Sequence, residues 1–144
     1  MKWITRSHVH VDRVACPWLI SRFIDSEAEF LFVPRNQIEQ IAEETGAIPF
    51  DAPGVELGHG EGRCSFESFL LKYDLKDAGL QRLAKIVHAA DIAEDIDSDP
   101  IGRGLEAIAS GYSLRFPDDL ENLEHQFAVY DGLYAWCRLQ VVNP

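Results

Sequence analysis

Two histidines and an aspartate alternate near the start of the chain: His8, His10 and Asp12. If this segment is extended, the three side chains share one face, because successive side chains of a strand point to opposite faces. Two imidazoles and a carboxylate in that arrangement can hold zinc or iron. The alternative is a solvent-facing strand edge, since simple alternation often produces such a pattern.

A second candidate is Cys16, which directly precedes Pro17. Proline suits the first position of a helix, so the sequence predicts a helix over residues 17–24 with Cys16 as its N-cap. A helix that starts at Asp12 and kinks at Pro17 is the alternative. At a helix N-terminus the pKa of a thiol falls, and the free N–H groups attract anions. Cys16 would then be reactive; otherwise it is a small buried hydrophobe. The predicted anion-binding residues are Arg13, Arg22 and Cys16.

The third candidate is a glycine-rich loop, residues 51–64, in which His59 stands between two glycines. Loops often carry functional residues, and a histidine flanked by glycines can approach a ligand closely. The glycine spacing does not match a phosphate-binding loop, and no Gly-Lys-Ser/Thr follows it, so no nucleotide cofactor is predicted. An ordinary surface loop is the alternative.

Helical spacing provides the fourth candidate. His88 and Asp91 are three residues apart, and Glu121 and His125 are four apart, so each pair shares one helical face. Facing helices build metal sites from such pairs, although many such pairs are only solvated.

The elements that must position these residues form a small sheet followed by a helical half. The expected strands are residues 2–6, 28–33 and 47–50. The expected helices are 17–24, Pro34 to about Glu44 with a stop at Gly46, 65–73, 77–93, 102–112 and 117–140. The predicted fold class is mixed α/β (α+β), with a small N-terminal sheet and a mostly helical C-terminal half.

Composition limits the class of protein. A length of 144 residues fits one domain, and 47% hydrophobic residues exclude general disorder. The net charge of −11 repels a phosphate backbone, so nucleic-acid binding is not expected and any anion site must be a local basic pocket. Three cysteines, no signal-peptide core and no long apolar run predict a soluble cytoplasmic protein.

Four segments are distinctive when taken together: residues 12–25, 49–59, 64–69 and 123–138, the last with Tyr-Asp-Gly-Leu-Tyr-Ala-Trp-Cys-Arg at its end. They resemble the C-terminal domain of the ChrB-type chromate resistance protein family over nearly the whole chain. The resemblance implies a role in chromate resistance, as part of a stress response. Longer members look like regulators of a chromate efflux operon and carry an additional N-terminal region, the expected DNA-binding part. This chain would be a stand-alone sensing or detoxification module.

The resemblance also favours particular residues. The positions that match the family pattern are Asp12, Arg13, Cys16, Trp18, Arg22, Glu56, His59, Cys64, Asp91 and His125. His8, His10 and His88 depart from it, which weakens the two-histidine strand as a site. The resemblance therefore implies a metal site of His59, Asp91 and His125 for Fe, Zn or Mn. The additional ligand or base would be Glu56 or Glu67.

Three functions follow as hypotheses. The first is a module that senses or binds chromate, a small oxyanion, with a bound transition metal as candidate cofactor. The second is a metal-dependent enzyme of unknown substrate. The third is a non-catalytic homodimeric interaction domain, because Tyr130, Tyr134 and Trp136 of the last predicted helix cannot all face one core.

Overall fold

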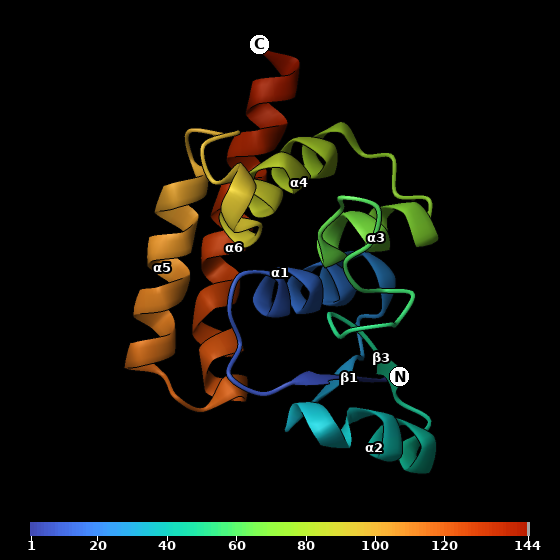
Figure 1. Cartoon of the computed structure of the whole chain (residues 1–144). Coiled ribbons are helices and arrows are strands. Elements are labelled where there is room, and N and C mark those ends of the chain that lie inside the picture. The colour runs from blue at the N-terminus through green and yellow to red at the C-terminus, as the bar shows by residue number, and fades with distance from the viewer. Residues whose placement is uncertain (144) are drawn as a thin grey trace.

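The computed structural model describes residues 1–143 and combines a small sheet with a helical C-terminal half (Figure 1). Its strands are β1 (Lys2–Arg6), β2 (Glu29–Val33) and β3 (Ile48–Pro49). Its α-helices are α1 (Asp12–Leu19), α2 (Ile38–Thr45), α3 (Ser65–Lys72), α4 (Ala78–Asp91), α5 (Gly102–Arg115) and α6 (Asp119–Val142). Short turns of other helix types are η1 (Ile20–Ile24), η2 (Arg35–Gln37) and η3 (Ala93–Asp95). The α+β fold class predicted from the sequence is confirmed.

The three strands form a parallel sheet in the order β2-β1-β3. Parallel strands need crossover connections: α1 connects β1 to its neighbour β2, and α2 connects β2 to β3, which pairs with the other side of β1. Figure 1 shows β1 between these two helices. The side chains of β1 alternate accordingly, since Trp3 lies in the main core and Ile4 packs with Ile38 of α2.

Local signals explain where several helices begin and end. Asp77 caps α4 by accepting a hydrogen bond from the backbone N–H of Leu80 at 2.9 Å. Asp118 caps α6 in the same way, with the N–H of Glu121 at 2.9 Å. The helix α2 stops at Gly46, whose φ of 74° lies in the left-handed region that glycine adopts easily.

The first helix differs from the prediction. It begins at Asp12 rather than Pro17, so Cys16 lies in its second turn and the expectation that it is the N-cap is wrong. The first turn is already closed by the N–H of Ala15, which bonds to the carbonyl of Val11 at 2.8 Å. The alternative start at Asp12 is therefore the one adopted. The π-helical turn η1 follows directly after Leu19.

The aromatic residues of α6 contact the protein itself. Tyr130 is fully buried, and Tyr134 and Trp136 are partly buried against the main core. Tyr134 packs edge-to-face on Phe23, and the guanidinium of Arg82 lies over the ring of Trp136. The aromatic surface expected for a partner is therefore largely used within the chain, and the homodimer stays a prediction. Among residues 1–143, no helix combines the length and the apolar character that a membrane crossing requires.

Candidate functional site

Charged side chains gather at the carboxyl edge of the parallel sheet. Arg6 is the last residue of β1, Arg35 follows β2 by two residues, and Asp51 follows β3 by two residues. The carboxyl ends of parallel strands meet at one edge, and crevices open there where successive connections leave on opposite faces. Here α1 and α2 cover opposite faces of β1, so the sheet topology itself opens a crevice at this edge.

A pocket of about 370 Å³ occupies this crevice. Its lining residues come from the strand ends, from α1 and α4 and from the glycine-rich loop: Arg6, Arg13, Arg35, Asp51, Ala52, Pro53, His59 and Asp91. Three guanidiniums thus gather in one pocket of a chain whose net charge is −11, together with the carboxylates of Asp51 and Asp91. Within residues 1–143, neither Arg6 nor Arg35 forms an ion pair, so both are free to bind an anion.

The guanidiniums are close enough to influence one another. The charge of Arg13 is the main cause that lowers the pKa of Arg6, and partial burial and the charge of Arg35 add to it. Arg13 itself donates to Asp51 at 3.1 Å and, through its other terminal nitrogen, to the carbonyl of His8 at 3.0 Å. An anion in the pocket would relieve the repulsion between these positive charges.

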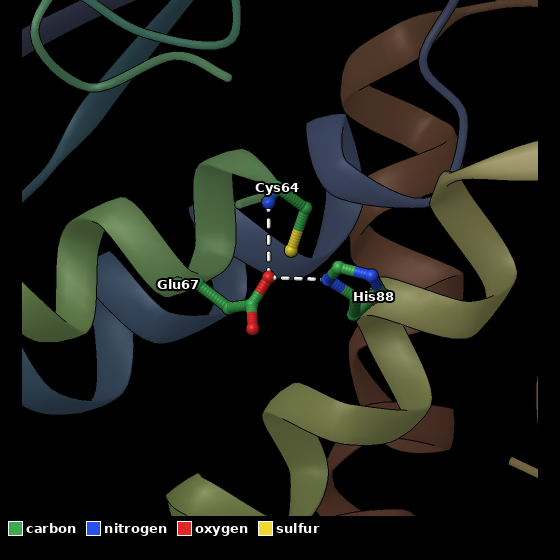
Figure 2. Close-up of side chains that lie close together, drawn as sticks. All are labelled: Cys64, Glu67 and His88. Atoms are coloured by element: carbon green, nitrogen blue, oxygen red, sulfur yellow. Dashed lines mark hydrogen bonds and ion pairs between the residues drawn. The ribbon is translucent and has the colours of Figure 1, made fainter. Parts of the chain in front are cut away.

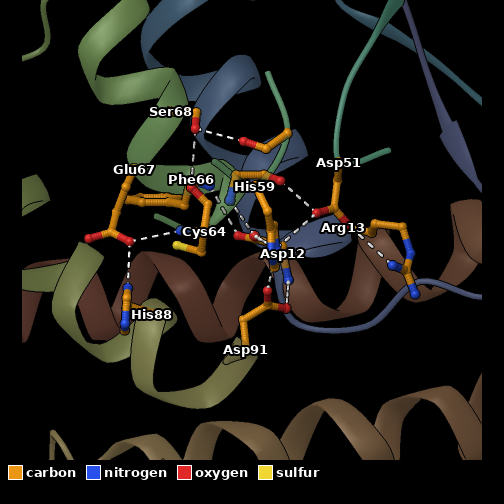
Figure 3. Close-up of polar contacts among 12 residues, drawn as sticks. Asp12, Arg13, Asp51, His59, Cys64, Phe66, Glu67, Ser68, His88 and Asp91 are labelled. Atoms are coloured by element: carbon orange, nitrogen blue, oxygen red, sulfur yellow. Dashed lines mark hydrogen bonds and ion pairs between the residues drawn. The ribbon is translucent and has the colours of Figure 1, made fainter. Parts of the chain in front are cut away.

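At the wall of the pocket, His59 faces three carboxylates (Figure 3). Its Nε2 atom lies 2.9 Å from Asp91, 3.4 Å from Asp12 and 3.6 Å from Asp51. The hydrogen bond with Asp12 and the three negative charges outweigh partial burial and raise the pKa of His59 to about 9. The loop thus holds an imidazolium against α1 and α4 when no cation is bound.

Asp12 is the buried centre of this cluster, with 1% of its surface exposed. Its two carboxylate oxygens accept the backbone N–H groups of Ser65 at 2.7 Å and Phe66 at 3.2 Å, at the N-terminus of α3. Burial and the charge of Asp91 nevertheless raise the pKa of Asp12. Burial also raises the pKa of Asp91. A nearby cation would stabilise both ionised forms.

The donor set suits a divalent metal ion. One ligand atom from each of Asp12, His59 and Asp91 lies within 4.8 Å of the others. A mixed imidazole and carboxylate set can take Fe²⁺, Zn²⁺ or Mn²⁺. Asp51 is a further carboxylate at the edge of the set, but it is already engaged by Arg13 and by the hydroxyl of Ser65 at 2.6 Å.

A second pocket, of about 620 Å³, adjoins the first. The two pockets share Arg6, Arg13 and Asp91, and the second extends along α4 and α5 towards Arg103 and Glu106. The space next to the carboxylates is thus larger than a small oxyanion needs.

The structure brings only part of the predicted anion site to the pocket. Of its three residues, only Arg13 lines the pocket. Arg22 instead forms two hydrogen bonds with Asp131, both at 3.0 Å, on the surface between η1 and α6. Cys16 is fully buried, and burial raises its pKa well above the ordinary value, so the expectation of a low pKa at a helix N-terminus is wrong.

The predicted metal ligands are also only partly brought together. His59 and Asp91 meet, but the exposed His125 stacks on Phe116 with ring centroids 4.2 Å apart and does not belong to the cluster. Glu56 is exposed and pairs with Lys72 at 3.0 Å. The third side chain of the cluster is that of Asp12.

The two-histidine strand is likewise not formed. The strand β1 ends at Arg6, and His8 has a φ of 66°, so the segment from His8 to Asp12 is not extended. His10 turns to α5, where Glu106 lies 3.6 Å from its Nε2. Asp12 contributes to a cluster, but with a histidine from the loop.

Sequence reasoning missed Arg6, Arg35 and Asp51. The available signal was their position at or just after three predicted strands. If the strands are taken as parallel, these positions fall at one edge of the sheet. The pattern of each single strand does not determine its direction relative to the other two.

The profile of the family described as "ChrB, C-terminal domain" matches residues 3–137. The chain belongs to this family. It is also 38% identical over 137 residues to a protein named "Protein ChrB" from Cupriavidus metallidurans. That match covers 93% of this chain and 40% of the relative, so the chain spans less than half of the relative's length. No solved structure matches the chain.

Proposed function

We propose that this ChrB-family domain takes part in chromate resistance by binding the chromate dianion in the arginine-lined pocket, beside a divalent metal ion held by Asp12, His59 and Asp91. The observation that carries the proposal is the meeting of Arg6, Arg13 and Arg35 in one pocket of an acidic chain. Arginine binds tetrahedral oxyanions through pairs of parallel N–H donors.

The charges of the site support pairing a metal with a dianion. Three guanidiniums and three carboxylates balance when His59 is neutral, as a metal ligand must be. A bound divalent ion then gives the site two positive charges in excess, and these balance the two negative charges of chromate. In a partly desolvated crevice, such a match contributes more to affinity than it does in water.

Chromate titration calorimetry tests the anion part. A hydrogen bond to a charged group contributes about 1.5–3 kcal/mol, so Arg6→Gln and Arg35→Gln should each weaken chromate binding by about 10–100-fold. The matched control is Arg22→Gln, which removes the same charge from the surface pair with Asp131 and should leave the affinity unchanged. Equal chromate affinities in all three variants would refute the proposal that chromate binds in this pocket.

Elemental analysis of protein purified without chelator or histidine tag tests the metal part. About one equivalent of Fe, Zn or Mn is expected at this cluster, and His59→Ala should lose that equivalent while keeping any metal bound elsewhere in the chain. The same calorimetry should then give weaker chromate binding in His59→Ala than in the loaded protein. A protein that stays empty after incubation with each of the three ions contradicts the metal site and leaves the arginine pocket to be judged separately.

A metal-dependent enzyme is the second candidate. The observation that favours it is the 620 Å³ pocket, which shares Arg6, Arg13 and Asp91 with the first and offers room for a larger anionic substrate. A metal ion at the junction could polarise a phosphoryl or carboxyl oxygen of such a substrate. Turnover of model phosphate esters by the loaded protein, lost in Asp91→Asn, would support this function over simple binding.

A further inference from the structure

A separate group of side chains of types that can bind a metal lies where α3 meets α4 (Figure 2). Cys64, Glu67 and His88 each offer one ligand atom within 4.8 Å of the others. Figure 2 shows the thiol of Cys64 and the ring of His88 both directed towards the Glu67 carboxylate. These residues supply sulfur, oxygen and nitrogen donors from the start of α3 and the last turn of α4.

The local sequence explains the convergence. Cys64 immediately precedes α3 and Glu67 occupies the third position of the helix, so its carboxylate returns to accept the N–H of Cys64 at 2.9 Å. The same oxygen lies 2.6 Å from Nδ1 of His88. The opposite ring nitrogen, Nε2, lies 2.6 Å from Asp95 in η3.

Asp95 completes an arrangement that is common around metal-bound histidines. When one ring nitrogen of a histidine binds a metal, the other usually donates to a carboxylate, which fixes the tautomer and the ring orientation. With the proton on Nε2 and donated to Asp95, the Nδ1 lone pair of His88 points at the Glu67 carboxylate. At 2.6 Å the two atoms share a proton in the metal-free protein, and a bound ion would replace that proton and move the two atoms apart.

The thiol of Cys64 is the soft member of the set. It is buried, as are most free cysteines, yet it sits beside a carboxylate and an imidazole rather than among hydrocarbon side chains alone. A thiolate, an imidazole and a carboxylate with one open position form a four-coordinate set that zinc and cobalt accept.

We propose that Cys64, Glu67 and His88 form a second metal site, which takes Zn²⁺ or a similar borderline-soft divalent ion, with Asp95 orienting His88. The site would cross-link α3, α4 and η3. Binding displaces two protons into solvent, that of the Cys64 thiol and the one shared by Nδ1 of His88 and Glu67, and leaves a water molecule in the fourth position. This site differs chemically from the Asp12, His59 and Asp91 cluster, because only it contains sulfur.

Cobalt titration of the full chain under reducing conditions tests the proposal. Thiolate ligation to Co²⁺ produces an intense near-ultraviolet charge-transfer absorption, which oxygen and nitrogen ligands alone do not produce. We expect this absorption to saturate at one equivalent for the sulfur site and to disappear on addition of Zn²⁺. Its absence at saturating cobalt would overturn the proposal, whatever the outcome at the first cluster.

Two variants with one buried thiol removed make the matched comparison. Cys64→Ser should lose the absorption, and Cys16→Ser should keep it, although Cys16 lies 3.8 Å from Asp12 of the first cluster. The reverse result would assign the thiolate to the first cluster and refute the second site. Asp95→Asn should keep the absorption but weaken cobalt affinity by about 10–100-fold, as typical for an orienting carboxylate.

X-ray absorption on the unmodified, zinc-loaded protein covers the case in which Cys64→Ser does not fold. A sulfur neighbour at about 2.3 Å from zinc is expected, along with nitrogen and oxygen neighbours at about 2.0–2.2 Å. A spectrum with nitrogen and oxygen neighbours only would mean that Glu67 simply caps α3, and the proposal would fail.

Discussion

A single methyl group added at Gly102 should separate α5 from α4, the helix that carries both His88 and Asp91. A Cβ atom built at this glycine would lie 2.7 Å from the Cβ of Ala89 and 3.1 Å from the carbonyl oxygen of Ile96. Ala89 is fully buried and its Cβ is fixed to the helix backbone, so it cannot rotate away. We therefore expect Gly102→Ala to force the two helices apart.

The cost of such overpacking is about 1–3 kcal/mol. The entropy of unfolding is about 2.1 cal/mol/K per residue, or about 0.3 kcal/mol/K for this chain of 144 residues. The Tm of Gly102→Ala should thus fall by about 3–10 °C in differential scanning calorimetry.

Gly104→Ala is the control, because it lies two residues away on the same helix. Apart from its chain neighbours and the nearby backbone of its own helix, no atom lies within 4 Å of a Cβ at this exposed position. Replacing an exposed helical glycine with alanine usually stabilises a protein by about 0.5–1 kcal/mol, so its Tm should rise by about 2–3 °C. If both variants shift in the same direction, helix propensity and not close approach sets the stability at Gly102, and the reasoning is refuted.

Three other perturbations test the site. Because His59 and Asp12 both have raised pKa values in the folded state, their contribution to stability is present at low pH and lost as pH rises. In urea unfolding of metal-free protein, the free energy of unfolding should therefore fall between about pH 4 and pH 9, first through Asp12 and then also through His59, and a rise would contradict the cluster. All three thiols are buried, so a thiol reagent should modify them slowly in native protein and rapidly after denaturation in guanidinium. Fast labelling of Cys16 in the native protein would contradict its buried position. His125→Ala should leave the metal content unchanged, since the ring stacks on Phe116 away from the cluster; loss of metal would restore His125 as a ligand.

Local patterns in the sequence predict the helices and strands well, because each depends on neighbours in the chain. The stop at Gly46 and the strand at residues 2–6 follow from local rules and agree with the structure. The start of α1 does not, since the proline rule favours Pro17. The preceding turn, closed by Ala15 and Val11, begins the helix five residues earlier.

The candidate site is harder to predict because its members are far apart in the chain. Asp12, His59 and Asp91 come from α1, a loop and the end of α4. Helical spacing identifies which residues share a face but not which faces meet. The family resemblance that groups His125 with His59 and Asp91 does not show which side chains meet either, and His125 stacks on Phe116 instead. The burial that raises the pKa of Cys16 is also a property of packing, which its position near a proline does not reveal.

The hydrogen bonds from Ser65 and Phe66 to Asp12 give the cluster its own spectroscopic reporters. Both donors are backbone amides at the first turn of α3, and both end on carboxylate oxygens of Asp12. Any event that changes the charge of that carboxylate alters the shielding of these two amide protons. In a ¹⁵N-correlated NMR spectrum they form a pair of peaks through which ligand occupancy can be followed without a label on the ligand or a chromophore in the protein.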